Sequence, residues 1–197
     1  IANAMIQNVL TGFSSAVPFA DPGKAKSSNL HGAGLRLGEI AGEELTPVVV
    51  ARNISDRMAV VHGRIRYTKR NRGAGVTQLR GVTLRPGEVK AWDINEISRS
   101  QGAGVESAGL EIDYSTQPGG VIVSALSVSR SGNHVFHVPM LDVAAQRSST
   151  GAYPFYMYGT SSTVVYIKNT TAVEQRYVAH LNYEGGKYRM GLKTIAP

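Results

Sequence analysis

The chain contains no cysteine, so it has neither a disulfide framework nor a thiolate for metal binding or nucleophilic catalysis. No apolar run approaches the roughly 18 residues that a membrane-spanning helix needs, and no membrane span is predicted. Charged residues are only 18% of the 197 residues, too few for a coiled coil, while an apolar content of 42% is too high for a disordered chain. The first residue is Ile1, so the chain is interpreted as a mature or excised fragment, and removal of a signal peptide stays open.

Glycine is abundant, with 22 residues, which disfavours a helical bundle. Apolar and polar residues alternate over 61–67, 110–115 and 177–183, a period of two that is typical of strands. Glycine-rich segments at Gln117–Gly120 and Glu184–Lys187 predict hairpin turns. One short helix is expected near Asp93–Ser98. The sequence therefore predicts an all-β protein of antiparallel sheets packed as sandwiches.

An internal repeat organises the chain. Val49–Ser55 resembles Val165–Thr171, 116 residues later, and Ala16–Asp21 resembles His137–Asp142 at an offset of 121. Downstream, Leu79–Pro86 resembles the C-terminal residues 190–197 at an offset of 111. Because the matches keep the same order, they predict a unit of roughly 115–120 residues that occurs twice. Segments 105–115 and 87–94 have no counterparts, so both repeats are expected to be incomplete.

The order of elements resembles that of bacterial immunoglobulin-like repeats: an apolar strand, an Asn-x-Ser/Thr turn, an alternating strand with a late tyrosine, a glycine-rich turn and Leu84-Arg-Pro-Gly-Glu88. The resemblance implies two tandem immunoglobulin-like antiparallel β-sandwiches, residues 1–100 and 101–197, with a boundary near residues 99–105. It also implies a secreted or cell-envelope location and no catalytic residues. The cysteine pair and core tryptophan of antibody domains are absent, since Trp92 lies late in its unit.

Positive charge is concentrated in one region. Ten basic residues lie between Arg52 and Lys90, opposed only by Asp56 and Glu88. Five of them share the outward face of a predicted strand and the following hairpin tip: Arg64, Arg66, Lys69, Arg70 and Arg72. They form either a solvated face that protects a sheet edge or a site for a polyanion such as an acidic polysaccharide. Because no aromatic residues interleave with them, no specific nucleic acid partner is predicted.

Aromatic side chains are concentrated in one segment that is flanked by Gly151 and Gly159. They either contact sugar rings or a partner protein or form a loop that seals the open end of a sandwich. The candidate contact residues are Tyr153, Phe155, Tyr156 and Tyr158.

Three other motifs have structural explanations. The Asn53 and Asn169 sequons match N-glycosylation sites, but their equivalence in the repeat favours Asx turns. His134 and His137 lie three residues apart on a predicted strand and so point to opposite faces, which argues against a metal site. Gly12–Ala16 lacks the last glycine of a nucleophile elbow. No catalytic residue, metal site or cofactor is predicted.

The sequence favours a non-enzymatic adhesion or scaffold module that is secreted or on the cell surface. The alternative is a module that binds acidic glycans or other polyanions through the basic hairpin, and a hydrolase is the third candidate. The expected partners are an anionic polysaccharide or another cell-surface protein, and the oligomeric state stays open.

Overall fold

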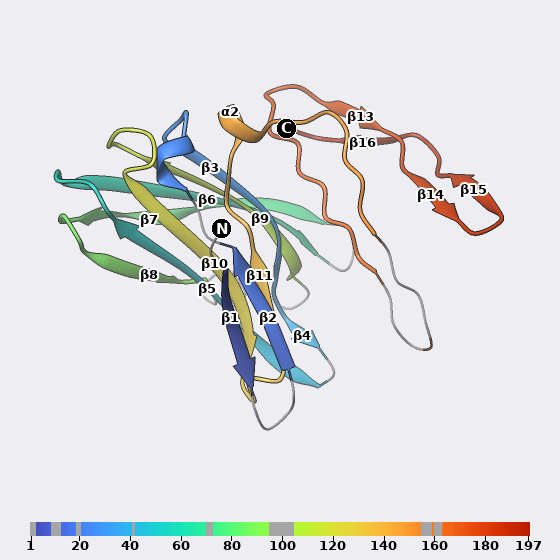
Figure 1. The fold of residues 1–197 in the computed structure, drawn as a ribbon, viewed down its shortest axis with the longest axis horizontal. Coiled ribbons are helices and arrows are strands. Elements are labelled where there is room, and N and C mark those ends of the chain that lie inside the picture. Colours follow the sequence, from blue (N-terminus) through green and yellow to red (C-terminus); the bar gives the residue numbers. More distant parts are fainter. Residues whose placement is uncertain are drawn as a thin grey trace. The chain divides into compact units, whose positions relative to one another are not determined.

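The computed structural model describes residues 3–8, 13–18, 21–40, 42–69, 73–94, 105–154, 159 and 163–197. The chain forms two compact units, Ile1–Tyr166 and Ile167–Pro197. It is mostly β, with several antiparallel sheets and one half-barrel (Figure 1), which confirms the coarser part of the predicted fold class. Within the described residues, no helix has both the length and the apolar character to cross a membrane.

One five-stranded sheet of the first unit has the order β12–β3–β9–β6–β7. Its strands are β3 (Asn29–Arg36), β6 (Ala59–Lys69), β7 (Ala74–Leu84), β9 (Val105–Tyr114) and β12 (Leu141–Asp142), and all neighbouring pairs are antiparallel. The predicted alternation in β6 holds, because Val61, Gly63, Ile65 and Tyr67 are buried, whereas His62, Arg64 and Arg66 are not.

The second five-stranded sheet has the order β11–β10–β5–β4, and β8 pairs with β5 beside β4. Its strands are β4 (Glu39–Ile40), β5 (Glu43–Asn53), β8 (Val89–Asp93), β10 (Val121–Ser129) and β11 (Val135–Val138). A separate hairpin joins β1 (Asn3–Asn8) to β2 (Phe13–Pro18). Two short helical turns, η1 (Pro22–Lys24) and α2 (Val143–Gln146), complete the unit.

A single hydrophobic core joins the two five-stranded sheets. Ile65 and Leu110 come from the first sheet and Val49 and Ala125 from the second, and all four are fully buried in one cluster. The two sheets therefore face each other across a common apolar layer.

Strands on both sides of the predicted boundary meet in these sheets. β9 lies between β3 and β6, and β10 pairs with β5, so residues 99–105, the border between the predicted halves 1–100 and 101–197, fall inside the first unit. The hairpin predicted at Gln117–Gly120 is wrong, because β9 and β10 belong to different sheets. The loop crosses between the sheets, and the Gly119 amide donates a hydrogen bond to the Tyr114 hydroxyl at 2.9 Å. Alternation identified β9, and an apolar run after a glycine-rich turn identified β10, but such local patterns carry no information on which strands pair.

The expected short helix lies mostly outside the described residues. Asp93 is the last residue of β8, and residues 95–98 are not among those described.

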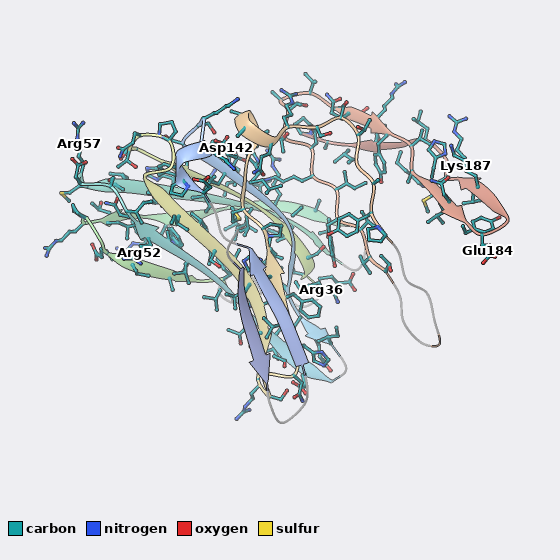
Figure 2. The ribbon with its side chains drawn as sticks, in the orientation of Figure 1. Arg36, Arg52, Arg57, Asp142, Glu184 and Lys187 are labelled. Carbon is teal, nitrogen blue, oxygen red and sulfur yellow. The ribbon has the colours of Figure 1, made fainter. Side chains whose placement is uncertain are left out.

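The second unit contains two small antiparallel sheets. β13 (Gln175–Tyr177) pairs with β16 (Lys193–Ile195), and β14 (His180–Tyr183) pairs with β15 (Gly186–Arg189). The hairpin predicted at Glu184–Lys187 is confirmed, and Figure 2 shows Glu184 at its tip and Lys187 on β15.

Candidate functional site

The predicted basic cluster lies partly on β6, where Arg64 and Arg66 occupy outward positions on either side of the fully buried Ile65. Both arginines are partly exposed. Lys69 ends β6, but its side chain lies outside the described residues, as do Arg70 and Arg72. The structure therefore brings two of the five residues onto one face, and the role of the whole cluster stays a prediction.

Acidic residues of β9 face this part of β6. The register places Glu111 opposite Arg64 and Asp113 opposite His62. Arg64 Nη1 lies 3.6 Å from Glu111 Oε2, whereas no described residue forms an ion pair with Arg66. Glu111 was not expected to be a counter-charge of Arg64, because it lies in the other predicted repeat. Since an opposite charge at this distance offsets Arg64, the face is less positive than its basic residues alone would make it.

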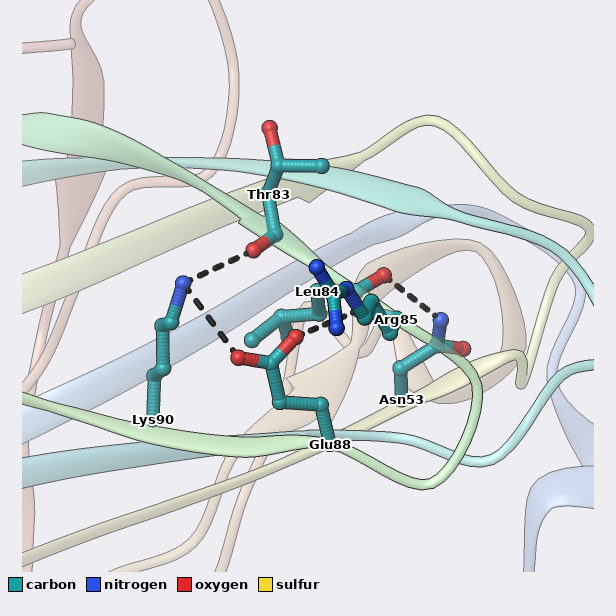
Figure 3. Close-up of polar contacts among 6 residues, drawn as sticks. All are labelled: Asn53, Thr83, Leu84, Arg85, Glu88 and Lys90. Carbon is teal, nitrogen blue, oxygen red and sulfur yellow. Dashed lines mark hydrogen bonds and ion pairs between the residues drawn. The ribbon is translucent and has the colours of Figure 1, made fainter.

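Two charged residues of the basic region, Glu88 and Lys90, form an ion pair and bond to the backbone near the turn between β7 and β8 (Figure 3). Lys90 Nζ donates to the Thr83 carbonyl at 3.0 Å and lies 3.4 Å from Glu88 Oε1. The Arg85 amide donates to Glu88 Oε2 at 2.7 Å, and this hydrogen bond lowers the pKa of Glu88. Glu88 therefore neutralises Lys90 locally and is not the counter-charge of Arg64.

Two further arginines, Arg52 near the end of β5 and Arg57 in the following turn, are exposed (Figure 2). Arg80 on β7 and Arg85 after it are exposed as well, so positive charge in the first repeat is not confined to the outward face of β6.

The turn from β5 to β6 is organised by the fully buried side chain of Asn53. Its amide nitrogen donates to the carbonyls of Arg57 and Leu84 at 2.6 and 3.0 Å. Its Oδ1 accepts from the amide and the hydroxyl of Ser55 at 2.9 and 2.7 Å. Both donor hydrogens and both acceptor positions of the side chain are satisfied. These contacts support the Asx-turn interpretation, and in the folded protein they leave no free amide for glycosylation.

Asn169 makes the same set of hydrogen bonds in the second repeat. Its amide nitrogen donates to the carbonyls of Val173 and Ile195 at 2.7 and 3.2 Å, and its Oδ1 accepts from the amide and hydroxyl of Thr171 at 2.9 and 2.8 Å. The partners are displaced by the offsets of the sequence repeat, 116 for Val173 and Thr171 and 111 for Ile195. The predicted equivalence of the two turns is confirmed. In contrast to Asn53, Asn169 is only partly buried.

The strand register of the β6–β7 hairpin also recurs. Tyr67 pairs with Gly75, and Tyr183 pairs with Gly186. In each pair the tyrosine occupies the space that a Cβ on the glycine would need. The remaining second-repeat pairs match first-repeat pairs at the same offsets: His180–Arg189, Leu181–Tyr188, Asn182–Lys187, Gln175–Ile195, Arg176–Thr194 and Tyr177–Lys193.

Burial does not recur with the register. Val49 is 0% and Tyr67 5% exposed, but their counterparts Val165 and Tyr183 are 58% and 56% exposed. Leu181, the counterpart of Ile65, is also partly exposed. The prediction that Val165, Leu181 and Tyr183 are buried is therefore wrong. β9 and β10 cover these positions in the first repeat, and no described segment supplies their counterparts to the second, where 163–170 forms no strand.

The N-terminal hairpin repeats the β10–β11 hairpin in register. Ala4 pairs with Val17, and 121 residues later Ala125 pairs with Val138. Three further pairs coincide at the same offset: Met5–Ala16, Ile6–Ser15 and Gln7–Ser14, which correspond to Leu126–His137, Ser127–Phe136 and Val128–Val135. β10 also pairs with β5, whereas among the described strands β1 pairs only with β2.

Asp142 joins the start of the second repeat to the first. Its buried carboxylate, at the start of α2 (Figure 2), accepts hydrogen bonds from the amides of Lys26 and Ser27 at 2.5 and 2.9 Å, the Ser27 hydroxyl at 2.6 Å and the Ala144 amide at 2.9 Å. Burial raises the pKa of Asp142, but these hydrogen bonds outweigh it and lower the pKa to about 2. The counterpart Asp21 caps η1 through the Gly23 amide at 3.1 Å. The resemblance of Ala16–Asp21 to His137–Asp142 already indicated that Asp21 and Asp142 are equivalent positions.

In the aromatic segment, Tyr153 is 79% exposed. Phe155, Tyr156 and Tyr158 lie outside the described residues, so their contact role stays a prediction.

A neighbouring aromatic contact was not predicted. The Tyr166 hydroxyl accepts a hydrogen bond from Arg36 Nη1 at 2.9 Å. The Tyr166 ring lies over Gly34, which has a φ of 87° and no side chain to obstruct the ring. The Arg36 guanidinium also lies 5.6 Å from the centroid of the Phe136 ring, a cation–π distance.

Histidines do not assemble a site in the described residues. His137 lies on β11 with Nε2 3.5 Å from Ser124 Oγ, and burial lowers the pKa of His137. Over the described parts of the chain, no three His, Cys, Asp or Glu side chains are grouped so that they would hold a metal ion.

Comparisons with known proteins identify no family. No protein-family model matches the chain, and no curated protein does. Among solved structures, a crystal structure of a Thermotoga maritima protein, described as Thermotoga maritima 1070, is similar with 13% sequence identity and a TM-score of 0.35, over 58% of this chain and 90% of that one. At this level the similarity carries no argument about function.

Proposed function

We propose that the chain is a non-enzymatic scaffold or adhesion module of a secreted or cell-envelope protein, built from tandem copies of one β unit. The observation that carries the proposal is that the residues shared by the two repeats are structural ones. The Asn-centred turn and the Tyr–Gly pairs are present in both repeats, and all of them maintain backbone architecture. The basic and aromatic candidates occur in one repeat only.

The immunoglobulin-like character of the unit is part of this proposal and rests on the sequence resemblance. Two facing antiparallel sheets with a shared core are compatible with it. Modules of this type present loops and faces on a rigid frame, so their binding surfaces change without a change in the frame.

The location is tested on intact cells of the source organism. Antibody labelling and mild trypsin treatment of whole cells should detect and cleave the protein without lysis. Detection only after lysis would contradict a surface or secreted role. A strain without the gene should also attach less well to surfaces or to other cells, and unchanged attachment would contradict the adhesion function.

Binding of a polyanion is the second candidate, favoured by Arg66, which has no ion-pair partner among the described residues, and by the exposed Arg52 and Arg57. The triple substitution of Arg64, Arg66 and Arg70 to Ser should lower the salt concentration at which the protein elutes from heparin–agarose. Glu111→Gln is the matched opposite change, because it removes the counter-charge of Arg64 and should raise that salt concentration. Equal elution of all three proteins would show that the face is only solvated.

A further inference from the structure

Two turns lie side by side at one end of the first unit (Figure 1): one joins β5 to β6, and the other joins β7 to β8. Asn53 holds them together. Its side chain donates to the carbonyls of Arg57 and Leu84, and its backbone amide donates to the Glu88 carbonyl at 3.0 Å. The two turns and the strand ends beside them therefore form one surface, the turn pair, which comprises residues 52–60 and 83–89.

Apolar side chains are exposed on the turn pair. Met58 is 61%, Val89 53% and Ile54 40% exposed. Turns are usually built from glycine, proline, asparagine, aspartate and serine, so the turn conformation itself does not call for an isoleucine and a methionine in the β5–β6 turn. Neighbouring exposed apolar side chains of this kind are typical of a surface that binds a partner.

Arginines lie next to these apolar side chains. Arg52 pairs with Val89 across β5 and β8. Arg57 directly precedes Met58, and Arg85 lies opposite Met58, one position beyond the last residue pair of β6 and β7. All three arginines are exposed, and no described carboxylate lies within ion-pair distance of them. The turn pair is therefore both apolar and cationic.

Few acidic groups oppose this charge. Asp56 is the only acidic residue of the β5–β6 turn, and Glu88 is already ion-paired with Lys90. The loop 115–120 also borders the turn pair, because its Gly120 carbonyl accepts from the Ile54 amide at 2.9 Å, and this loop contains no charged residue. Asp56 is thus left to oppose three arginines, and the turn pair keeps a net positive charge.

We propose that the turn pair docks the first unit on an anionic lipid bilayer. In this arrangement the guanidinium groups bind headgroup phosphates, for which their planar donor geometry is well suited. Met58, Ile54 and Val89 enter the boundary between the headgroups and the acyl chains, where their apolar surface leaves water. A hydrated acidic polysaccharide would use the arginines but would bury none of the apolar side chains. The combination therefore favours a lipid surface, and the inference goes beyond the proposed scaffold function.

Co-sedimentation of the purified chain with vesicles tests the arginines. The protein should bind vesicles made of equal parts of phosphatidylglycerol and phosphatidylcholine, and it should not bind vesicles of phosphatidylcholine alone. Substitution of Arg52, Arg57 and Arg85 together by Ser should weaken binding at least about tenfold, since each arginine near an anionic bilayer strengthens binding about fivefold.

A matched triple variant controls for the loss of net charge. It replaces Arg130, Arg176 and Arg189 by Ser, which are also exposed and lie outside the turn pair. Arg130 follows β10 at the end remote from Asn53, because Val121 pairs with Asn53 at the other end of that strand. This variant should weaken vesicle binding by about threefold or less, since distant charges are screened.

The apolar contact is tested by Met58→Ser, with Met190→Ser as the matched control at an exposed methionine of the second unit. Met58→Ser should weaken vesicle binding at least about fivefold because it removes apolar surface that enters the bilayer, and it should not change elution from heparin–agarose. Met190→Ser should change neither. Because both methionines are exposed, both variants should fold, and an unchanged urea midpoint of Trp92 fluorescence verifies this.

A fluorescent label reports the contact at a single position, since the chain has no cysteine of its own. A polarity-sensitive dye on Met58→Cys should shift its emission to the blue when phosphatidylglycerol vesicles are added. The same dye on Val76→Cys should not, because Val76 is similarly exposed, at 51%, but lies near the other end of β7.

Three results would overturn the proposal: no binding to the anionic vesicles, equal weakening by the two triple variants, or equal dye shifts at the two positions. If the arginine substitutions weaken binding to vesicles and to heparin alike while Met58→Ser weakens neither, a soluble polyanion and not a bilayer is the partner of the turn pair. The scaffold function is tested separately by surface detection and attachment of cells, so failure of vesicle binding would leave that function open.

Discussion

Substitution of Asn53 by Ala removes the side chain that holds the β5–β6 turn, and Asn169→Ala makes the same change in the second repeat. The two asparagines make equivalent hydrogen bonds, and they differ in burial, since Asn53 is 0% exposed and Asn169 is partly exposed. Comparison of the two substitutions therefore separates two contributions to the free energy of unfolding: the burial of the asparagine and the hydrogen bonds that it makes.

The expected loss follows from the groups left without a partner. In Asn53→Ala the Arg57 carbonyl keeps the Ser55 hydroxyl at 3.0 Å. The Leu84 carbonyl and the Ser55 amide each lose one hydrogen bond, whereas the single hydrogen of the Ser55 hydroxyl stays with the Arg57 carbonyl. At about 1 kcal/mol for each lost buried hydrogen bond, the free energy of unfolding should fall by about 2 kcal/mol. Asn169 and Thr171 are partly exposed, so hydrogen bonds to water replace those lost in Asn169→Ala, and the substitution should cost about 1 kcal/mol or less.

Urea unfolding followed by tryptophan fluorescence measures the difference. Trp92 is the only tryptophan of the chain, is 7% exposed and donates from Nε1 to the Arg80 carbonyl at 3.0 Å, so it reports on the first unit. With an m-value of about 2 kcal/mol/M, Asn53→Ala should lower the midpoint by about 1 M. Asn169→Ala should leave the Trp92 transition unchanged. A loss below about 1 kcal/mol for Asn53→Ala, or equal shifts for both variants, would refute this reasoning.

Two further predictions use the same comparison of equivalent positions. Ile65→Ala should cost about 2–5 kcal/mol in a urea titration because Ile65 is fully buried, whereas Leu181→Ala should cost less than about 1 kcal/mol; similar costs would mean that Leu181 is covered in solution. The pKa of Asp142 falls from 3.8 to about 2 on folding, so its contribution of about 2 kcal/mol is present above pH 4 and lost as the pH falls toward 2. The difference in unfolding free energy between the parent and Asp142→Asn should be constant from about pH 5 to 7 and shrink below pH 4, and a difference that does not change with pH would contradict this assignment.

The sequence was sufficient for features that depend on local pattern. Alternation located β6 and β9, and the glycine-rich segment at Glu184–Lys187 located the second-unit hairpin. The recurrence of Asn-x-Ser/Thr predicted two equivalent turns, because an asparagine side chain that bonds to the backbone nearby needs only its own neighbours.

Pairing partners were not accessible in the same way. Val105–Tyr114 and Val121–Ser129 read as a hairpin because they are adjacent in sequence, but each pairs with strands from the first part of the chain. The prediction that Val165 and Tyr183 are buried was wrong for the same reason. Both residues have the apolar character of core residues, but burial needs a neighbouring strand as well as an apolar side chain.

The counter-charge of Arg64 shows how this affects a functional prediction. Ten basic residues against two acidic ones between Arg52 and Lys90 suggested an unopposed positive surface, because charges were counted along the chain. In a sheet the nearest charge to a residue lies on the adjacent strand, about 4.7–4.9 Å away, and β9 brings Glu111 to Arg64 from 47 positions later in the sequence. Any affinity for a polyanion therefore depends on Arg66 and the hairpin tip more than on Arg64. Arg66→Ser alone should consequently lower the elution salt on heparin–agarose more than Arg64→Ser alone, and the reverse order would show that the Arg64–Glu111 pair opens when the polymer binds.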